Sequence, residues 1–224
     1  MSLALLFTMP LLGHSQESKK TIRENIEWLD VYMPNTNDST LPRILLIGNS
    51  ITRGYYPEVA QMLAGKGYVA RLTTSKSVGD PALLKEIELI MGYYKFDIVH
   101  FNNGLHGFGY TEEDYKKAFP GFVQTIRKNA PGAKLMWATI TPMRTKEDAK
   151  VFSPLTERIK VRNKIALDYL ATQKDISIDS LWEFSIDHPE FWQGGDGTHP
   201  VASGFHAIAE KVAAALSTLI NDKK

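Results

Sequence analysis

The chain contains no cysteine among its 224 residues. This absence excludes disulfides, thiolate zinc sites, iron–sulfur clusters and cysteine nucleophiles. An excess of charge of one sign is also lacking, because 26 lysines and arginines balance 25 aspartates and glutamates and leave a formal net charge of +1. No stretch concentrates lysine and arginine, so we expect no nucleic-acid partner. The composition, 43% hydrophobic and 23% charged, is that of an ordinary globular protein.

Long apolar runs are scarce as well. The N-terminal run, residues 3–12, has 10 residues, whereas a membrane-spanning helix needs about 20. Gly13 and Ser15 follow the run, and then comes a polar segment, a pattern typical of a secretory signal that is cleaved after Ser15. No basic residue precedes the run. A buried N-terminal segment is the alternative, but Pro10 and the absence of helical periodicity argue against it.

These features predict the organisation of the whole chain. We expect a signal peptide over residues 1–15, a polar leader over 16–40 and one folded domain over 41–224. The protein should then be secreted or periplasmic, with no stable membrane insertion once the signal has been removed.

Apolar and β-branched segments alternate with amphipathic helical patterns through the domain. The predicted strands are Arg43–Gly48, Tyr68–Thr74, Asp97–Asn103, Lys134–Pro142 and Ile176–Leu181. The first is continuously apolar after its arginine, as expected of a central parallel strand that is covered on both faces. Such alternation predicts an α/β fold, a three-layer α/β/α sandwich with a mostly parallel five-stranded sheet. Chemistry in such folds occurs beyond the carboxyl ends of the strands.

Helical spacing predicts the segments between the strands. Helices are expected from Pro57, from Pro81, over residues 112–129, over Leu155–Gln173 and after a cap at Ser203. Pro120 and Gly121 lie in the middle of the third helix, where they predict a kink or a division into two pieces.

A serine follows the first strand in the sequence GNSITRG, residues 48–54. Ser50 should lie just beyond the strand tip, beside free N–H groups at a helix start that can stabilise an oxyanion. Serine in this place is also a common helix cap, so both interpretations stay open at this point. The segment lacks the lysine of a phosphate-binding loop.

A serine nucleophile requires a base, and the base requires an orienting acid. Two histidines lie three residues after an aspartate: His100 after Asp97 and His199 after Asp196. Residues three apart on a strand point to opposite faces, so the first pair cannot form a dyad, and His100 is expected in or near the core. The second pair lies in a glycine-rich loop, where the two side chains can meet. A turn aspartate beside a surface histidine is the alternative for this loop.

The G-N-S segment after the first strand and the D-x-x-H segment before the last helix together resemble the SGNH (GDSL-type) hydrolases, which have a flavodoxin-like fold. The resemblance implies that Ser50 is the nucleophile, His199 the general base and Asp196 the residue that orients it. It also implies that the Gly79 N–H helps to bind the oxyanion. The family usually places an asparagine donor after the third strand, but this chain has His106 there, with Asn102 and Asn103 as nearby alternatives. A neutral imidazole can supply one N–H donor.

The resemblance therefore implies a serine esterase that cleaves carboxylic esters through an acyl-enzyme. Its substrate is a small-molecule or glycan ester, and O-acetylated carbohydrate is the preferred class, while lipid and thioester substrates stay open. An acyltransferase with the same triad and a non-catalytic glycan-binding module are the alternatives. We expect no cofactor and no metal, since the cluster of Asp187, His188, His199 and His206 lacks a helix-spaced ligand pair. The oligomeric state is left open.

Overall fold

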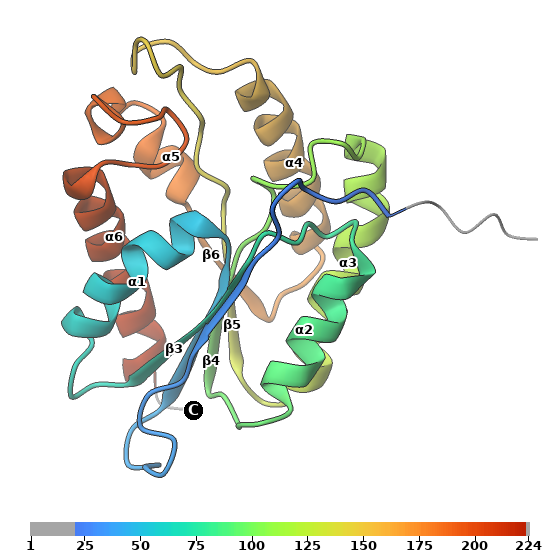
Figure 1. Cartoon of the computed structure of the whole chain (residues 1–224). Helices are drawn as coiled ribbons and strands as arrows, with labels where there is room; N and C mark the ends of the chain where they lie inside the picture. The colour runs from blue at the N-terminus through green and yellow to red at the C-terminus, as the bar shows by residue number, and fades with distance from the viewer. Residues whose placement is uncertain (1–20, 223–224) are drawn as a thin grey trace, which may run out of the picture.

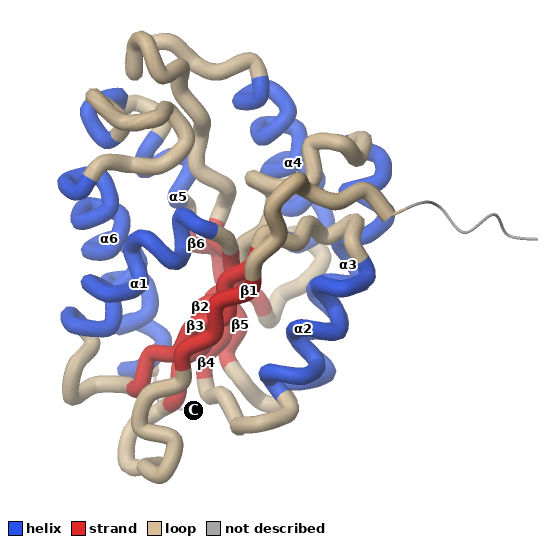
Figure 2. The backbone as a smooth tube through the Cα atoms, in the orientation of Figure 1, coloured by secondary structure: helices blue, strands red, loops and turns tan. Residues whose placement is uncertain are grey.

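A six-stranded sheet lies in the middle of the computed structural model, which describes residues 21–222 (Figure 2). The strands are β1 (Leu29–Tyr32), β2 (Arg43–Gly48), β3 (Tyr68–Thr74), β4 (Ile98–Phe101), β5 (Lys134–Ala138) and β6 (Ile176–Asp179). They stand in the order β1-β3-β2-β4-β5-β6, and neighbours are parallel except that β1 runs antiparallel to β3. The five parallel strands have the flavodoxin-like order. The predicted signal peptide lies outside the described residues.

Helices cover both faces of the sheet (Figure 1). They are α1 (Ser50–Met62), α2 (Pro81–Met91), α3 (Glu112–Asn129), α4 (Leu155–Leu170), α5 (Leu181–Ser185) and α6 (Ala202–Asn221), with a 3₁₀ turn η1 at Pro189–Phe191. Helices α1 and α6 pack together on one face, and α2, α3 and α4 lie on the other. The predicted three-layer α/β/α sandwich is confirmed. No helix within residues 21–222 is long and apolar enough to cross a membrane.

The predicted strand count of five was wrong, because the polar leader supplies a sixth strand. β1 pairs along the whole of its length with the second half of β3, from Leu29 opposite Thr74 to Tyr32 opposite Arg71. Its side chains are largely exposed. An edge strand is held mainly by main-chain pairing on one side, so four residues, LDVY, are enough to form it although they bury little apolar surface.

Four predicted helix features also differ from the structure, and one of them is the end of α4, which lies at Leu170 rather than Gln173. α1 begins at Ser50 rather than Pro57, because the side chain of Asn49 caps it by accepting from the Ile51 N–H at 2.9 Å. α3 continues through Pro120 as one helix, so it is not divided into two pieces. α6 has Val201 at its N-cap, two residues before the predicted cap at Ser203, since the Val201 N–H is held by the Phe191 carbonyl at 2.7 Å.

The central strand β2 has β3 as its neighbour on one side and β4 as its neighbour on the other. The chain thus adds one strand to each side of β2 in turn. The loops after β2 and β4 therefore diverge at the carboxyl end of the sheet, which is where open α/β sheets bind their ligands. Ser50 follows β2, and the segment that contains His106 follows β4.

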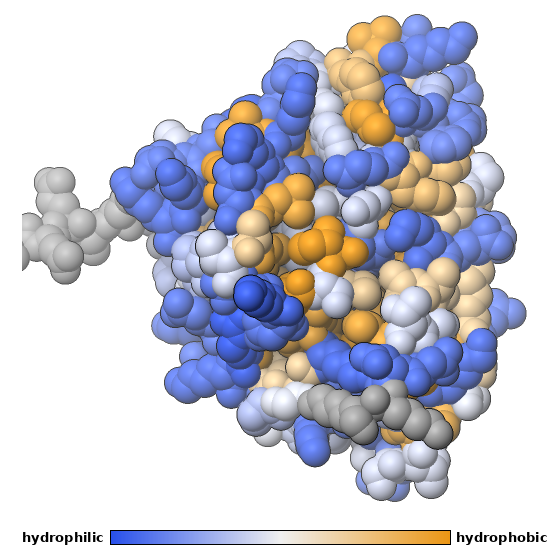
Figure 3. Space-filling view, turned by 180° about the vertical axis from the view of Figure 1, so that it is seen from behind, coloured by the Kyte–Doolittle hydropathy of each residue, from blue (hydrophilic) through white to orange (hydrophobic). Residues whose placement is uncertain are grey.

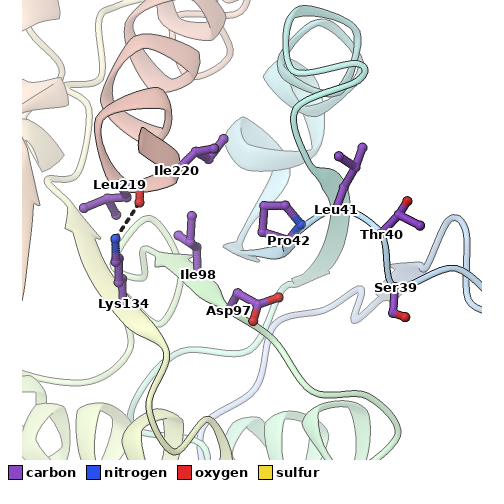
Figure 4. Close-up of a pocket in the computed structure, with 9 residues that line it drawn as sticks. All are labelled: Ser39, Thr40, Leu41, Pro42, Asp97, Ile98, Lys134, Leu219 and Ile220. Atoms are coloured by element: carbon purple, nitrogen blue, oxygen red, sulfur yellow. Dashed lines mark hydrogen bonds between the residues drawn. The ribbon is translucent and has the colours of Figure 1, made fainter. Parts of the chain in front are cut away.

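The surface also carries an apolar patch and a recess. Seen from behind, apolar residues gather in the middle of the face and hydrophilic residues surround them (Figure 3). A recess of about 340 Å³ lies at the opposite end of the parallel strands from Ser50 (Figure 4). It is lined by Ser39, Thr40, Leu41, Pro42, Asp97, Ile98, Lys134, Leu219 and Ile220. Lys134 there donates to the carbonyl of Leu219 at 2.7 Å, which helps to hold the end of α6.

Candidate active site

Ser50 is the first residue of α1 and is not the cap of that helix. Asn49 occupies the cap position, and its carboxamide oxygen satisfies the N–H of Ile51. The hydroxyl of Ser50 is thereby left for another partner. Its Oγ lies 2.8 Å from Nε2 of His199, 149 residues away in the sequence.

The loop before α6 brings Asp196 back onto His199, as the D-x-x-H spacing predicts. Asp196 Oδ2 lies 2.7 Å from His199 Nδ1. Its other oxygen, Oδ1, accepts from the backbone N–H groups of His199 at 2.7 Å and Thr198 at 2.8 Å. Partial burial opposes ionisation, but these hydrogen bonds prevail and hold the pKa of Asp196 below its ordinary value. Asp196 is thus an acceptor at neutral pH.

This arrangement fixes the tautomer of His199. A carboxylate has no proton to donate, so Nδ1 of the neutral ring carries the hydrogen and Nε2 carries the lone pair. Nε2 can then accept the proton of Ser50. The three side chains form a continuous chain of hydrogen bonds from a hydroxyl to a carboxylate, which is the arrangement needed to activate a serine nucleophile.

Two backbone N–H groups in the turns that follow β2 and β3 are candidates for binding an oxyanion. Ser50 begins α1, so its own N–H has no partner within the helix. Gly79 lies in the turn after β3, just before Asp80, which caps α2. Neither N–H donates to another group among residues 21–222. A Cβ at Gly79 would lie about 3.0 Å from the ring of Tyr110, so the ring would have to shift by a few tenths of an ångström to admit a larger residue.

Asn103 and Asn102 both follow β4, but their amides have structural partners. The Asn103 side chain accepts from the Val78 N–H at 3.1 Å and donates to the Lys76 carbonyl at 2.9 Å. It therefore ties the loop before Gly79 to the end of β4. The Asn102 amide donates to the carbonyl of Ala138 at 2.7 Å.

His106 is another candidate from the loop after β4, and it is partly buried. Burial lowers its pKa and proximity to His199 acts in the same direction, while Glu24 partly offsets both. The ring is accordingly neutral at neutral pH and has a single N–H. Its Nδ1 lies 3.6 Å from a carboxylate oxygen of Glu24.

A buried arginine that the sequence did not single out holds this loop. Arg162 of α4 is almost fully buried, and its guanidinium donates to the carbonyls of Gly104 and His106, both at 2.8 Å, and Gly107 at 3.0 Å. Glu112 at the start of α3 lies 3.3 Å from the Nε of Arg162. The position of His106 therefore depends on contacts from two helices. Within α4, Arg162 has no local feature that distinguishes it from a solvent-exposed arginine.

The N-terminal leader also reaches this end of the sheet, which the sequence did not predict. The carboxylate of Glu24 accepts from the Gly107 N–H at 2.9 Å. The indole of Trp28 lies edge-on to His106, with ring centroids 6.3 Å apart. Figure 1 shows the dark blue segment before β1 crossing the end of the sheet where α1 begins. Glu24 and Trp28 are thus part of the surroundings of the site.

The other Asp–His pair is divided, as expected. Asp97 accepts from the Arg43 N–H at 2.8 Å. His100 is fully buried in the core, with Nε2 3.1 Å from a carboxylate oxygen of Asp179.

The remaining histidines of the predicted cluster are also apart from the triad. His188 pairs with Glu190, and His206 pairs with Glu58. Within residues 21–222, no group of three or more histidine, aspartate or glutamate side chains is arranged to hold a metal ion.

No family model and no curated protein matches the sequence. Solved structures do match over most of the chain. One is a carbohydrate esterase family 3 protein from Talaromyces cellulolyticus, with a TM-score of 0.63 and 18% identity, covering 82% of this chain and 100% of that one. A GDSL-like lipase from Bacteroides thetaiotaomicron gives 0.60 and 15%, covering 79% and 88%. The C-terminal catalytic domain of peptidoglycan O-acetyltransferase A from Streptococcus pneumoniae gives 0.56 and 19%, covering 80% and 94%.

These neighbours share an architecture with this chain at low sequence identity. The chain has the SGNH (GDSL-type) hydrolase fold. A shared fold does not assign a reaction, so the function must be argued from the side chains at the site.

Proposed function

We propose that this chain is a serine esterase of SGNH type that hydrolyses carboxylic esters through an acyl-enzyme. The observation that supports this most strongly is the unbroken chain from Ser50 Oγ to His199 Nε2, at 2.8 Å, and from His199 Nδ1 to Asp196 Oδ2, at 2.7 Å. A serine that served only as a binding or capping group would not need a base held in one tautomer. The non-catalytic glycan-binding module is therefore disfavoured.

The first half of the reaction follows from the positions of these atoms. Ser50 Oγ attacks the ester carbonyl while His199 Nε2 takes the hydroxyl proton. The negative charge that develops on the carbonyl oxygen is stabilised by the N–H groups of Ser50 and Gly79, with a third donor from His106. Asp196 stabilises the imidazolium without itself becoming protonated.

The second half returns the enzyme to its starting state. The tetrahedral intermediate collapses, the bond between the carbonyl carbon and the alcohol oxygen breaks, and His199 gives its proton to the leaving alcohol. Water then attacks the carbonyl carbon of the acyl-enzyme while His199 takes a proton from it. The bond between this carbon and Ser50 Oγ breaks, His199 gives the proton to Oγ, and the acid is released. No step requires a group that these residues do not supply.

We propose O-acetylated carbohydrate as the substrate class. Two structural neighbours support this choice, a carbohydrate esterase and an acetyl esterase. The acyltransferase alternative is supported by the resemblance to an O-acetyltransferase domain, since transfer to a sugar hydroxyl would use the same acyl-enzyme. Product analysis with and without an acceptor sugar distinguishes the two reactions.

We further propose that the protein is exported and acts outside the cytoplasm. The support is the sequence pattern of residues 1–15, an apolar run followed by small residues.

The test of the catalytic proposal is turnover of a short-chain aryl ester by the wild type and by single variants. Ser50→Ala and His199→Ala should each lower kcat at least ~10³-fold, because triad members act as a unit. Asp196→Asn should have a similar or somewhat smaller effect. Thermal midpoints serve as the folding control. Near-normal turnover by folded Ser50→Ala protein would refute the serine-esterase mechanism.

A further inference from the structure

α1 places a positively charged side chain one turn after the nucleophile. Arg53 follows Ser50 by three residues, and residues three apart on a helix share a face with Cβ atoms about 5–6 Å apart. Arg53 is exposed. Its guanidinium is therefore on the rim of the site and open to solvent.

No carboxylate among residues 21–222 pairs with Arg53, and its guanidinium donates no hydrogen bond within that part of the chain. Other cations near the site are paired. Lys76 contacts Glu27, and Arg158 lies 2.8 Å from Glu112. Arg53 thus keeps its hydrogen-bonding capacity for a partner that is not part of the described chain.

The Arg53 side chain is nevertheless held in place. Its guanidinium carbon lies 4.3 Å from the centroid of the Trp28 ring, a cation–π contact. Main-chain hydrogen bonds fix Trp28 in turn, since its N–H donates to Ser75 Oγ at 3.0 Å and its carbonyl accepts from the Ser75 N–H at 3.1 Å. The same indole lies edge-on to His106. Trp28 therefore spans from Arg53 on α1 to His106 in the loop after β4.

A stacked guanidinium with free donors is suited to one class of ligand. Arginine presents its N–H groups in a planar fork that matches the two oxygens of a carboxylate. Holding the fork against an aromatic ring before the ligand arrives reduces the entropy lost on binding. The acidic groups nearby have partners of their own: Asp196 has His199, and Glu24 has the N–H of Gly107.

We infer that Arg53 and Trp28 form a subsite for a carboxylate on the ester substrate. The inference rests on the proposed esterase function and narrows its substrate class to anionic esters, of which O-acetylated acidic sugars are the carbohydrate members. The carboxylate belongs to either the alcohol or the acyl part of the ester, and the substrates below distinguish the two.

The experiment compares matched anionic and neutral esters. 4-Acetoxybenzoate against its methyl ester places the charge on the alcohol part, and 4-nitrophenyl hemisuccinate against 4-nitrophenyl butyrate places it on the acyl part. The quantity measured is the ratio of kcat/KM for the anionic ester to that for its neutral partner. Arg53→Gln should lower this ratio ~10-fold in one of the two pairs, the effect of one lost charge-assisted interaction.

Further variants separate recognition of charge from other effects. Arg53→Lys should keep part of the ratio, because it retains the charge but loses the fork. Trp28→Leu should lower the ratio by removing the support of the guanidinium, and added salt should lower it in the wild type. The matched control is Lys66→Gln, an exposed residue in the turn after α1 that removes the same charge far from Ser50 and should leave the ratio unchanged.

Two failures can be told apart. If the wild type hydrolyses the neutral esters and Arg53→Gln leaves the ratio unchanged in both pairs, the carboxylate subsite is refuted and the esterase proposal stands. If the wild type hydrolyses none of the four esters, the esterase proposal fails and the subsite fails with it.

Discussion

In the candidate active site, hydrogen bonds to neighbouring groups determine which chemical role each side chain has. Asn49 caps α1 and leaves the hydroxyl of Ser50 free for His199. Asp196 fixes the proton of His199 on Nδ1. Asn103 and Asn102, which could have donated to an oxyanion, are bonded to backbone groups instead. Each of these amides uses one of its two N–H groups in this way, and His106 is the further side chain of the loop after β4 that we test as a third donor.

His106→Ala tests this role. A donor that acts on charge developing in the transition state should change kcat more than KM, so we expect kcat to fall ~10²-fold or more with little change in KM. His106→Asn restores the usual family donor and should recover part of the loss. The measurement is steady-state kinetics of both variants beside their thermal midpoints. If His106→Ala keeps its kcat, His106 packs near the pocket without stabilising the oxyanion, and the donor role moves to Asn102, Asn103 or backbone N–H groups alone.

At the scale of elements, a buried ionic network joins β4, β6 and α6. Asp179 at the end of β6 is fully buried, with Oδ2 3.1 Å from His100 Nε2 and Oδ1 2.9 Å from Lys211 Nζ. Burial alone would raise the pKa of Asp179, but His100 and Lys211 prevail and hold it below the ordinary value. The charge of Asp179 therefore favours the folded state at neutral pH.

Asp179→Asn should lower the free energy of unfolding by about 3 kcal/mol, the lower end of the range for breaking a buried pair, because Lys211 is partly exposed and can turn to water. Because the folded-state pKa of Asp179 is depressed, its contribution to the free energy of unfolding is fully present at pH values above the ordinary aspartate pKa. The contribution is lost as the pH falls through the folded pKa. The difference between wild type and variant should thus be constant near neutrality and shrink below about pH 4.

The matched control is Asp168→Asn, which breaks an exposed pair with Lys164 four residues away on α4. That change should alter stability by no more than about 0.5 kcal/mol. Denaturant unfolding at several pH values measures both variants. If Asp179→Asn costs no more than Asp168→Asn, the buried network does not stabilise the fold.

At the scale of the whole molecule, the leader belongs to the folded domain. It contributes β1 to the sheet and Glu24 and Trp28 to the surroundings of the site. The side chain of Asp30 in β1 also pairs with Arg71 of β3 at 3.0 Å. Without the leader, β3 would become an unprotected edge strand and Arg71 would lose its carboxylate.

Two shortened chains test the predicted boundaries. A chain that begins at Gln16, the predicted mature terminus, should keep the thermal midpoint and the turnover of the full chain. A chain that begins at Leu41 should lose at least about 10 °C in Tm, because each lost kcal/mol lowers Tm by about 2–4 °C at this size. It should also aggregate through the exposed edge of β3. Equal midpoints for the two chains would show that β1 is dispensable for the fold.

The sequence by itself determined the features that depend on residues close together in the chain. β2 and β3 have the predicted bounds. β2 is a continuous apolar run between turn residues, which has few alternatives to a covered strand, and β3 is rich in β-branched and aromatic residues and follows the turn at Gly65 and Gly67. The contact of Asp196 with His199 was also predictable, since a glycine-rich loop lets side chains three residues apart meet. The burial of His100 followed from its place on a central strand.

Only the tertiary structure decided which distant positions meet. Ser50 and His199 are 149 residues apart, and the order of strands in the sheet places them 2.8 Å from each other. β1, Trp28 and the contact of Trp28 with Arg53 come from the leader, whose strand has only four residues and is largely exposed. Periodicity and helix caps are properties of short segments and can be recognised locally. Edge pairing and side-chain contacts between remote loops depend on the packing of the complete sheet, and no short segment encodes that packing.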